Sequence, residues 1–402
     1  KIHSKISKEI QKAEKRYGDK FDKEEFLKTN LRVIENSKKI SEISKRLNHC
    51  LTNKDLVELK NLILELGIND PVSGTQNWTD VRQFNLMFST KIGSNVDTSS
   101  LIYLRPETAQ GIFLNFLNVI NSTRVKIPFG IAQIGKAFRN EIIARQFVFR
   151  MREFEQMEMQ FFVEPGKEMN FYDDWKNKRM KWHKSLDLGD HLYRFHNHEN
   201  LAHYANAACD IEFLFPMGFK ELEGIHSRTD FDLKSHQKLS GKKINYYDQK
   251  TKSSFVPYVI ETSVGLDRLF LSVLSASYQN QKLKNGTERI FLKIPFGIAP
   301  IKAAILPLNA KDNLPEKAKL LYDELKTFFN IQYDEKDSIG KRYRRQDAIG
   351  TPYCITFDYD TLKDNSVTIR NRNSMVQERV LLSSTKDYII NNVSIDNLLT
   401  QV

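Results

Sequence analysis

The apolar positions at the start of the chain recur with the period of an α-helix. Ile2, Ile6 and Ile10 are spaced four residues apart among polar neighbours, which predicts a helix with one apolar stripe. A capping sequence at residues 52–55 and the glycine at Gly67 predict the start and the end of a later helix. We therefore expect charged helices here. They could form a plain solvated surface or an arm that faces RNA, and the solvated surface is the simpler interpretation.

The pattern then changes to short apolar runs. Residues 84–88 and 101–104 predict two buried strands with a polar loop between them, and residues 109–120 predict a helix with one apolar face. Residues 132–163 alternate as strand, loop and strand, and residues 256–264 predict another strand that leads into a helix.

Towards the C-terminus, strands and helices alternate. Residues 303–308 predict a strand, residues 314–329 a helix, and residues 351–358 and 366–372 two more strands, followed by a helix near Tyr388. This alternation predicts a separate α/β domain.

The heptapeptide KIPFGIA occurs twice, starting at Lys126 and at Lys293. The first copy runs into QIGKAFRNEI and the second into PIKAAILPLN, so the flanking sequences share no wider similarity. We interpret the repeat as a coincidence.

Composition limits the possible partners. The 402 residues include 61 basic and 50 acidic side chains, and the net charge of +11 suits a polyanionic partner without requiring one. No run approaches the ~18 apolar residues that span a bilayer, and the polar first residues contain no signal-peptide core, so we expect no membrane partner and no secretion. Cys50, Cys209 and Cys354 form no CxxC pair, which fits a reducing cytoplasm.

Three histidines and a cysteine gather in the segment FHNHENLAHYANAACD. His196, His198, His203 and Cys209 are ligand types that zinc uses, but their spacing matches no familiar zinc site. We therefore expect no zinc.

Four clusters combine strand-forming residues with charges. In the first, Arg139 and Glu141 stand two apart on a predicted strand, so both side chains enter one site. A planar guanidinium can hold a carboxylate or a phosphate with two hydrogen bonds. In the second, strand alternation puts five side chains on one face. This face could line a functional site, and a solvated face of an antiparallel sheet is the alternative. These five are Arg150, Arg152, Phe154, Gln156 and Glu158.

The other two clusters flank predicted helices. The third runs from Glu261 to Arg268, and Gly265 within it lets the backbone come close to a ligand. The fourth, Leu104-Arg105-Pro106-Glu107-Thr108, puts a charged pair between a buried strand and a helix.

Together the clusters resemble the motifs of class II aminoacyl-tRNA synthetases. FRNE followed by FRMREFEQME resembles motif 2, and SVGLDR resembles motif 3. LRPETAQGIFLNF, REFEQMEMQFF, KELEGIHSRTDFDL and VIETSVGLDR are similar to the glycyl-tRNA synthetases in particular, and the resemblance covers roughly residues 75–395. Motif 1, which forms the class II dimer interface, and an upstream arginine of the glycine site are not found. We therefore expect the chain to begin partway through the protein.

The resemblance implies an α/β protein. An α+β catalytic domain would be built on an antiparallel sheet flanked by helices, and the C-terminal α/β domain would bind the anticodon. The expected boundaries are 1–75 for a charged helical insertion or appended module, 76–295 for the catalytic domain, with insertions near 164–200 and 234–254, and 296–402 for the anticodon-binding domain.

The resemblance also implies the reaction. The enzyme would activate glycine with ATP and Mg²⁺ to glycyl-adenylate and then transfer the glycyl group to the 3′ end of tRNA(Gly). It would act in the cytoplasm as a homodimer, formed through a motif 1 region that this chain lacks.

By resemblance, Arg139 and Arg268 are the catalytic residues. Arg139 would contact the α-phosphate of ATP and the glycine carboxylate, and Arg268 would stack on adenine opposite Phe154, where stacking contributes about 1–3 kcal/mol. Glu141 would accept from the adenine amino group, and Glu221 lies where the family places ATP and Mg²⁺ contacts. The implied ATP-binding residues are Arg139, Asn140, Glu141, Phe149, Arg150, Met151, Arg152, Glu153, Phe154, Glu221, Leu222, Gly265, Leu266, Asp267 and Arg268.

Glycine has no side chain, so its ammonium group is the only polar handle besides its carboxylate. By resemblance Glu107, Glu158 and Glu261 converge on that ammonium, and a cation among three carboxylates lowers their repulsion. The hydroxymethyl group of Ser263 would fill the space that a larger substrate needs, and no smaller amino acid competes, so we expect no editing. The implied glycine-binding residues are Glu107, Phe154, Glu155, Gln156, Met157, Glu158, Glu261, Thr262, Ser263, Val264 and Gly265.

In the C-terminal domain, basic and aromatic residues near strand ends suit contacts with phosphates and unstacked bases of an anticodon loop. An ordinary solvated basic surface is the alternative. The candidates are Arg342, Arg344, Arg345, Arg370 and Arg372.

Two rival functions remain. A non-catalytic synthetase paralogue, such as a polymerase accessory subunit or an RNA-binding regulator, usually lacks the motif 2 and motif 3 charges, whereas Arg139, Glu141 and Arg268 are present here. A class II synthetase of another specificity is disfavoured by the three glutamates and Ser263.

Overall fold

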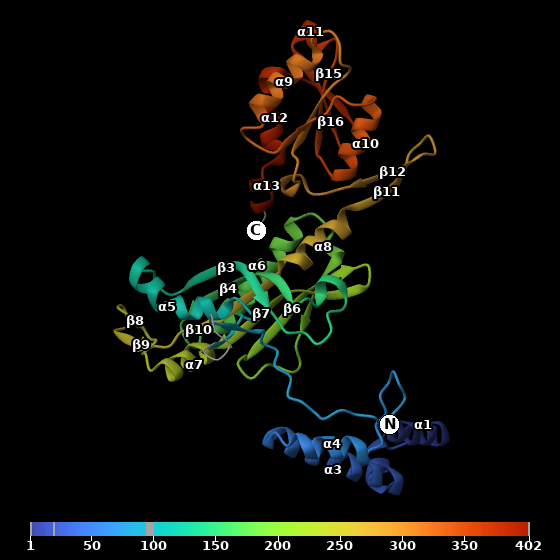
Figure 1. The fold of residues 1–402 in the computed structure, drawn as a ribbon, viewed down its shortest axis with the longest axis vertical. Coiled ribbons are helices and arrows are strands. Elements are labelled where there is room, and N and C mark those ends of the chain that lie inside the picture. The colour runs from blue at the N-terminus through green and yellow to red at the C-terminus, as the bar shows by residue number, and fades with distance from the viewer. Residues whose placement is uncertain (1, 19–20, 94–99, 401–402) are drawn as a thin grey trace. The chain divides into compact units, whose positions relative to one another are not determined.

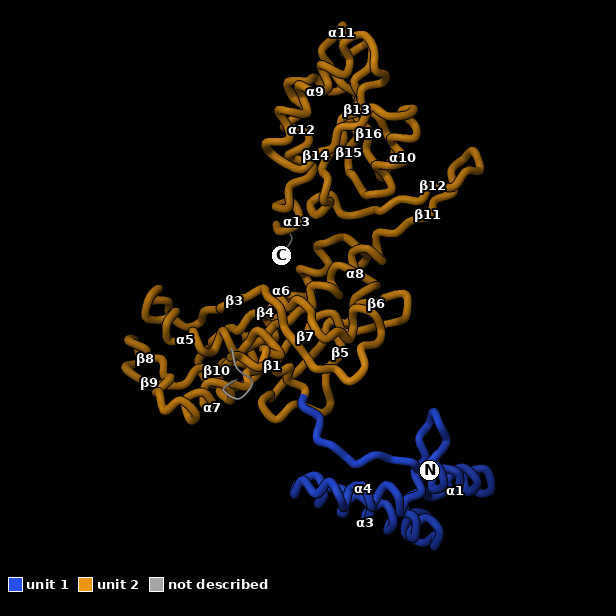
Figure 2. Tube along the Cα trace, in the orientation of Figure 1, with its two compact units in different colours: residues 1–85 blue, residues 86–402 orange. Residues whose placement is uncertain are grey.

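The computed structural model describes residues 2–18, 21–93 and 100–400 (Figure 1). The chain divides into two compact units, residues 1–85 and residues 86–402 (Figure 2). No helix within the described ranges is long and apolar enough to cross a membrane.

The first unit is helical, as predicted. It contains α1 (Ile2–Tyr17), α2 (Lys23–Thr29), α3 (Leu31–Asn53) and α4 (Leu56–Glu65). Side chains of Asp22, Asn30 and Asp55 accept hydrogen bonds from the first turns of α2, α3 and α4, which fixes where these helices begin. The cap of α4 is thus Asp55, whereas Thr52 belongs to α3. Gly67 follows α4 with φ +59°, as expected of a helix end.

The second unit begins with a short ribbon that corrects the sequence prediction. Residues 84–88 form no strand; instead β1 (Ser89–Ile92) pairs with β2 (Ser100–Tyr103) in a two-stranded sheet. Phe84, Leu86 and Leu101 are exposed rather than buried. A ribbon of two strands leaves its faces uncovered, so an apolar run alone did not establish burial. The predicted polar loop falls largely on residues 94–99, outside the described residues.

The catalytic part is built on a six-stranded sheet in which every pair is antiparallel, as predicted. In spatial order its strands are β3 (Phe129–Phe138), β4 (Glu153–Val163), β10 (Tyr258–Gly265), β7 (Gly218–Thr229), β6 (Ala207–Phe215) and β5 (Tyr193–Asn197). The helices α5 (Ala109–Thr123) and α7 (Phe231–Ser240) pack against the face that carries Phe162 and Val259. The helices α6 (Glu168–Ser185) and α8 (Leu266–Ser277) pack against the opposite face, with Phe161 and Ile260 (Figure 1).

Strand β4 crosses from the open end of the sheet to the core. Phe154, Gln156, Glu158, Gln160 and Phe162 follow at every second residue, so they lie on one face. Phe162 at one end packs on Phe116 of α5, with ring centroids 4.5 Å apart. The same face is therefore apolar under α5 and polar beyond it, and this change positions the site described below.

Two expected insertions contribute differently to the structure. Residues 164–200 supply α6 and the edge strand β5, so they belong to the sheet and its cover. Residues 234–254 complete α7 and form most of a separate ribbon of β8 (Tyr246–Asp248) and β9 (Ser253–Phe255).

A hairpin of β11 (Tyr278–Lys282) and β12 (Glu288–Leu292), which the sequence analysis did not predict, leads to the C-terminal α/β part. Its sheet has the order β14 (Ile331–Tyr333), β13 (Ala303–Pro307), β15 (Tyr353–Phe357), β16 (Ser366–Asn371) and β17 (Gln377–Leu381). The strands β14, β13 and β15 pair in parallel, and the pairs β15–β16 and β16–β17 are antiparallel. The helices are α9 (Leu314–Leu325), α10 (Ile339–Ile349), α11 (Thr361–Asp364), α12 (Leu382–Val393) and α13 (Asp396–Leu399). The predicted α/β alternation is confirmed, although α9 ends four residues before Phe329.

The two KIPFGIA copies adopt different structures. The first leads into β3, whereas Phe296–Ile298 of the second form a 3₁₀ turn. A shared heptapeptide with two conformations is what a coincidental repeat predicts.

Candidate active site

A pocket of about 100 Å³ opens at the polar end of the sheet, where β3, β4 and β10 meet. Every residue that lines it, except Val148, is among those expected from the sequence. The lining residues are Arg139, Glu141, Val148, Phe149, Arg150, Met151, Phe154, Glu155, Gln156, Glu221, Ser263, Gly265, Asp267 and Arg268.

The first cluster enters the pocket from a loop rather than from a strand. Strand β3 ends at Phe138, so Arg139 and Glu141 follow it, and the strand alternation that was invoked for them is wrong. The backbone holds them instead: Arg139 N donates to Arg152 O at 2.9 Å. The Arg139 guanidinium donates to Pro106 O at 3.2 Å and lies over the Phe154 ring, 5.3 Å from its centroid.

The second cluster shares one face only in part. Strand β4 begins at Glu153, so Arg150 and Arg152 precede it and only Phe154, Gln156 and Glu158 alternate on it. Arg150 lies 3.9 Å from the Glu141 carboxylate in the pocket. Arg152 is turned to the loop, where its Nε donates to Glu141 O at 3.0 Å.

Other residues expected to bind ATP lie outside the pocket lining. Asn140 N donates to Leu86 O at 2.7 Å, and Leu266 is the first residue of α8. Glu153 forms a surface ion pair with Lys136, and the Leu222 side chain is buried in the core under α6.

Arg268 closes the pocket from α8. Its Nη1 donates to Glu221 O at 3.0 Å and lies 3.1 Å from the Glu221 carboxylate, and its Nη2 donates to Phe149 O at 3.1 Å. The guanidinium also lies over the Phe149 ring, 5.3 Å from the centroid. Arg268 therefore faces the pocket while tied to two different segments.

Behind the pocket the same sheet face carries buried carboxylates. Gln156 Nε2 donates to Ser263 Oγ at 2.8 Å, and Ser263 is paired in register with Glu158. Gln160, the next residue on this face of β4, is paired with Glu261. Residues on this face of β4 thus run directly from the pocket into the acid cluster, which we define as Glu107, Glu158 and Glu261.

The members of the acid cluster have different partners. Glu158 Oε2 accepts from the backbone N of Thr108 at 3.0 Å and from its hydroxyl group, and Glu107 Oε1 accepts from Gln110 Nε2 at 2.7 Å. Both oxygens of Glu261 accept hydrogen bonds: Oε1 from His226 at 3.1 Å, and Oε2 from Gln160 at 2.6 Å and from Arg228 at 2.8 Å.

These surroundings set different protonation states. Burial, and then the charge of Glu261, raise the pKa of Glu158 to about 8. Burial alone would raise the pKa of Glu261 as well, but the hydrogen bond from His226 and the charge of Arg228 lower it to about 2. Burial also raises the pKa of Glu107. Near neutral pH the cluster therefore holds one fixed anion and at least one carboxyl group that is largely protonated.

Several buried carbonyl oxygens beside the cluster have no partner. Within the described ranges no group donates to Oε1 of Gln110, Gln156 or Gln160. Unsatisfied buried acceptors are uncommon in native proteins and cost stability. Carboxylates and spare carbonyl oxygens together can bind a compact ligand that carries several N–H donors.

Sequence reasoning missed residues that hold this cluster. Gln160, His226 and Arg228 contact a cluster carboxylate, and so does Thr108, which the fourth cluster named without a role. Two-residue spacing could have found most of them, because Gln160 follows Glu158 on β4, and His226 and Arg228 stand two apart on β7.

The structure corrects the expectation for three C-terminal arginines. Arg342, Arg370 and Arg372 are buried, so they present no basic surface. Arg342 donates to the carbonyl groups of Pro307, Leu308 and Asp334 at 2.6–3.1 Å, and Arg372 donates to those of Gly350 and Ile294 at 2.6 Å. Arg370 and Arg289 both bind the buried carboxylate of Asp347.

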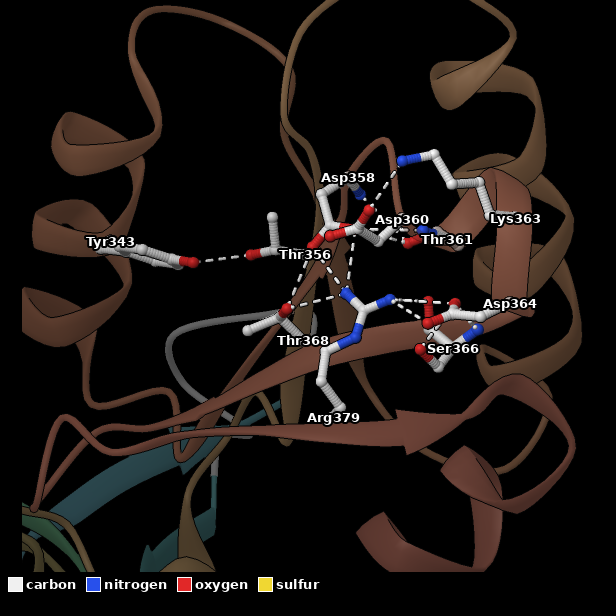
Figure 3. Close-up of polar contacts among 10 residues, drawn as sticks. All are labelled: Tyr343, Thr356, Asp358, Asp360, Thr361, Lys363, Asp364, Ser366, Thr368 and Arg379. Atoms are coloured by element: carbon white, nitrogen blue, oxygen red, sulfur yellow. Dashed lines mark hydrogen bonds and ion pairs between the residues drawn. The ribbon is translucent and has the colours of Figure 1, made fainter.

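The other two arginines of that set lie in α10 and are exposed. Arg345 pairs with Asp334 and Asp337, at 2.7 and 2.8 Å, and Arg344 carries no ion pair with any described residue. Arg379 of β17 is also engaged internally: it binds Asp358 at 2.7 Å and Asp364 at 3.0 Å (Figure 3).

The histidine segment runs from β5 through a connecting loop into β6. His198 Nε2 lies 2.8 Å from Asp210 Oδ2, and Cys209 is buried in β6. Across the described ranges no three His, Cys, Asp or Glu side chains are arranged to hold a metal ion.

Comparison with known families gives three matches along the chain. Residues 1–86 match "Glycyl-tRNA synthetase insertion domain 1", residues 94–277 match "tRNA synthetase class II core domain (G, H, P, S and T)" and residues 302–392 match "Anticodon binding domain".

Sequence relatives are similar over most of the chain. The glycine–tRNA ligase of Chlorobaculum tepidum is 52% identical over 332 residues, which cover 82% of this chain and 70% of the relative. The glycine–tRNA ligase of Macrococcus caseolyticus is 52% identical over 334 residues, 83% of this chain and 72% of the relative.

Solved structures of lower identity share the fold. The RNA binding domain of threonyl-tRNA synthetase from Cryptosporidium parvum Iowa II has a TM-score of 0.58 at 18% identity and covers 77% of this chain and 80% of that chain. Prolyl-tRNA synthetase from Cryptosporidium parvum has a TM-score of 0.57 at 16% identity, over 79% of this chain and 63% of that chain.

Proposed function

This chain belongs to the glycine–tRNA ligase family, and we propose that the pocket binds ATP while the acid cluster binds the ammonium group of glycine. The protein is a class II aminoacyl-tRNA synthetase that uses glycine, ATP and tRNA(Gly). The observation that carries the proposal is that one continuous sheet face connects an arginine-lined pocket with the buried carboxylates of the acid cluster.

The proposed nucleotide position follows from the charges of the pocket. Arg139 would neutralise the α-phosphate and hold the glycine carboxylate for in-line attack, and this chemistry needs positioning and charge neutralisation. Adenine would lie between Phe154 and Arg268. Small-molecule sites usually exceed ~300 Å³, and this pocket holds about 100 Å³. We therefore infer that Arg268 leaves Phe149 O when the nucleotide enters.

Glu221 suits the proposed Mg²⁺ contact. Its carboxylate lines the pocket and is about half exposed, and Mg²⁺ usually takes one or two carboxylates together with substrate phosphates. When bound, the ion would supply charge neutralisation for the phosphates.

The proposed glycine position follows from the acceptors. An ammonium group would offer hydrogen bonds to Glu107 and Glu158 and relieve their repulsion with Glu261. The Oε1 atom of Gln156 is a further acceptor on the same face. Ser263, held by Gln156, would limit the space beside the glycine α-carbon.

The test is amino-acid-dependent ATP–pyrophosphate exchange by the full-length protein, with glycine, alanine and serine measured side by side. Exchange with glycine alone supports the proposal. Exchange with alanine or serine at a similar rate would refute the role of Ser263 in specificity. Absence of exchange from folded protein would leave the accessory-protein interpretation.

The remaining expectations are parts of the same proposal. The boundaries 1–75, 76–295 and 296–402 agree with the order of the family matches. A homodimer, formed through a motif 1 region, stays part of the proposal. Free cysteines support a cytoplasmic location. Arg344 and Arg345 stay candidates for anticodon contacts.

A further inference from the structure

Arg228 of β7 has no role in the reaction as described so far, although it contacts the acid cluster. Its side chain is 4% exposed. One edge of the guanidinium binds Glu261, with Nη1 2.8 Å from Oε2. Its Nε and Nη2 donate to the two oxygens of Asp232 at 2.8 and 2.9 Å. Its plane also lies over the ring of Tyr204, 4.3 Å from the centroid, so the side chain is fixed from three sides.

The charges around Glu261 show why this arginine matters. Glu107, Glu158 and Asp232 are further acidic groups nearby, whereas Arg228 donates directly to Glu261 and His226 lies on its other oxygen. Arg139 is a more distant cation on the side of Glu107. A buried carboxylate without a cation takes up a proton rather than stay charged.

We propose that Arg228 is a positioning residue for the amino-acid site, which keeps Glu261 ionised and fixed so that the acid cluster attracts the ammonium group of glycine. Asp232 fixes Arg228 in turn, because it holds the two nitrogens that do not face Glu261. Without Arg228 the cluster would bind a further proton and lose the negative charge that an ammonium group requires. The inference rests on the proposed function of the cluster.

A second arginine–glutamate pair, whose glutamate also lies on β7, serves as a control that distinguishes positioning of the glycine site from a general contribution to stability. Arg179 of α6 donates to both oxygens of Glu223 at 2.6 and 3.1 Å, and Glu223 is 1% exposed. Along β7, Gly224 and His226 lie on the face of the acid cluster. Glu223 therefore lies on the opposite face, which α6 covers. Arg179 and Arg228 thus hold similarly buried glutamates on opposite faces of one sheet.

The test measures glycine-dependent ATP–pyrophosphate exchange by the full-length wild type, Arg228→Met, Arg228→Lys and Arg179→Met. Glycine and ATP are varied separately at several values from about pH 6 to about pH 9, and thermal unfolding of each variant is recorded. We expect Arg228→Met to raise the KM for glycine at least about tenfold near neutral pH, with little change in the KM for ATP. The defect should shrink as the pH rises, because Glu261 regains its charge.

The other variants make the result specific. Arg228→Lys retains the cation but cannot bind Glu261 and Asp232 together, so we expect a partial rescue. Arg179→Met should lower the melting temperature without changing the KM for glycine or its pH profile. If Arg228→Met does not fold, the same shift in the KM for glycine is expected, at smaller size, in Arg228→Lys and Asp232→Asn.

Two results would overturn the inference. The first is an unchanged KM for glycine in a folded Arg228 variant. The second is a loss of kcat that is the same at every pH and follows the melting temperature. No exchange by the wild type overturns the proposed function, and this inference with it.

Discussion

The acid cluster of the catalytic part and the network of Asp347, Arg289 and Arg370 in the C-terminal part are both charged and largely buried, but they differ in what they leave open. In the C-terminal part, the carboxylate of Asp347 is bound by Arg289 and Arg370, and Arg372 donates to carbonyl groups. Beside the acid cluster, the buried Oε1 atoms of Gln110, Gln156 and Gln160 accept nothing from any described residue. Spare acceptors in a buried site point to a ligand, whereas a saturated network holds elements together.

The strongest test of this contrast removes the centre of the saturated network. We expect Asp347→Asn to lower the free energy of unfolding by about 3–5 kcal/mol, because it leaves buried arginines without their anion. The exchange rate per folded molecule should stay unchanged. Urea denaturation followed by circular dichroism measures the first quantity. Asp337→Asn is the control: its carboxylate pairs with Arg345 at the surface, and such pairs contribute at most about 1 kcal/mol.

The matching change in the acid cluster should have the opposite effects. We expect Glu158→Gln to reduce glycine activation by about 100-fold, or ~2.7 kcal/mol, because an ammonium acceptor is lost. The free energy of unfolding should be nearly unchanged near neutral pH, because Glu158 is largely protonated there and glutamine is neutral as well. Exchange kinetics and denaturation of the same preparation measure both. A large loss of stability would place Glu158 with the saturated residues instead.

A pH experiment sharpens the comparison without mutation. Burial raises the pKa of Glu158 from 4.5 to about 8, so its bound proton contributes stability that is complete below about pH 4.5 and is lost as the pH rises towards 8. Glycine offers a cation in place of that proton. We expect glycine to raise the melting temperature more at pH 8 than at pH 6, and the difference to vanish in Glu158→Gln. An equal shift at both pH values in the wild type would contradict this.

The smallest effect is expected at an exposed arginine of the C-terminal part. Arg344→Ala should change the free energy of unfolding by less than about 0.5 kcal/mol and leave pyrophosphate exchange unchanged. If Arg344 contacts tRNA phosphate, the KM for tRNA should rise several-fold and its salt dependence should weaken. Aminoacylation at two salt concentrations measures this. An unaltered KM for tRNA would remove Arg344 from the anticodon candidates.

The sequence predicted most accurately those features that depend on the spacing of neighbouring residues. The N-terminal helices have caps that can be recognised from neighbours, and on β4 the two-residue period brought Phe154, Gln156 and Glu158 to one face. The candidate residues at the pocket were predicted by resemblance, and the structure brings most of them together.

What the sequence did not reveal depends on distant partners. Arg342 is buried because carbonyl groups from Pro307 and Asp334 meet it, and neither lies beside it in the chain. Arg228 faces Glu261 across two paired strands, so its contact exists only once the sheet has its register. Residues 84–88 have the composition of a buried strand, yet Phe84 and Leu86 are exposed and the ribbon that follows has two strands.

Strand β4 also fixes the distance between the two ends of the site. The ring of Phe154 and the carboxyl group of Glu158 are separated by four residues of extended chain, a length of about 13 Å. The loop before β4 can gain or lose residues during evolution without changing that length. One inserted residue within β4 would turn the side chains on one side of it to the face that α6 and α8 cover. Insertions within β4 are therefore excluded, whereas a change before Glu153 leaves this particular spacing unaltered.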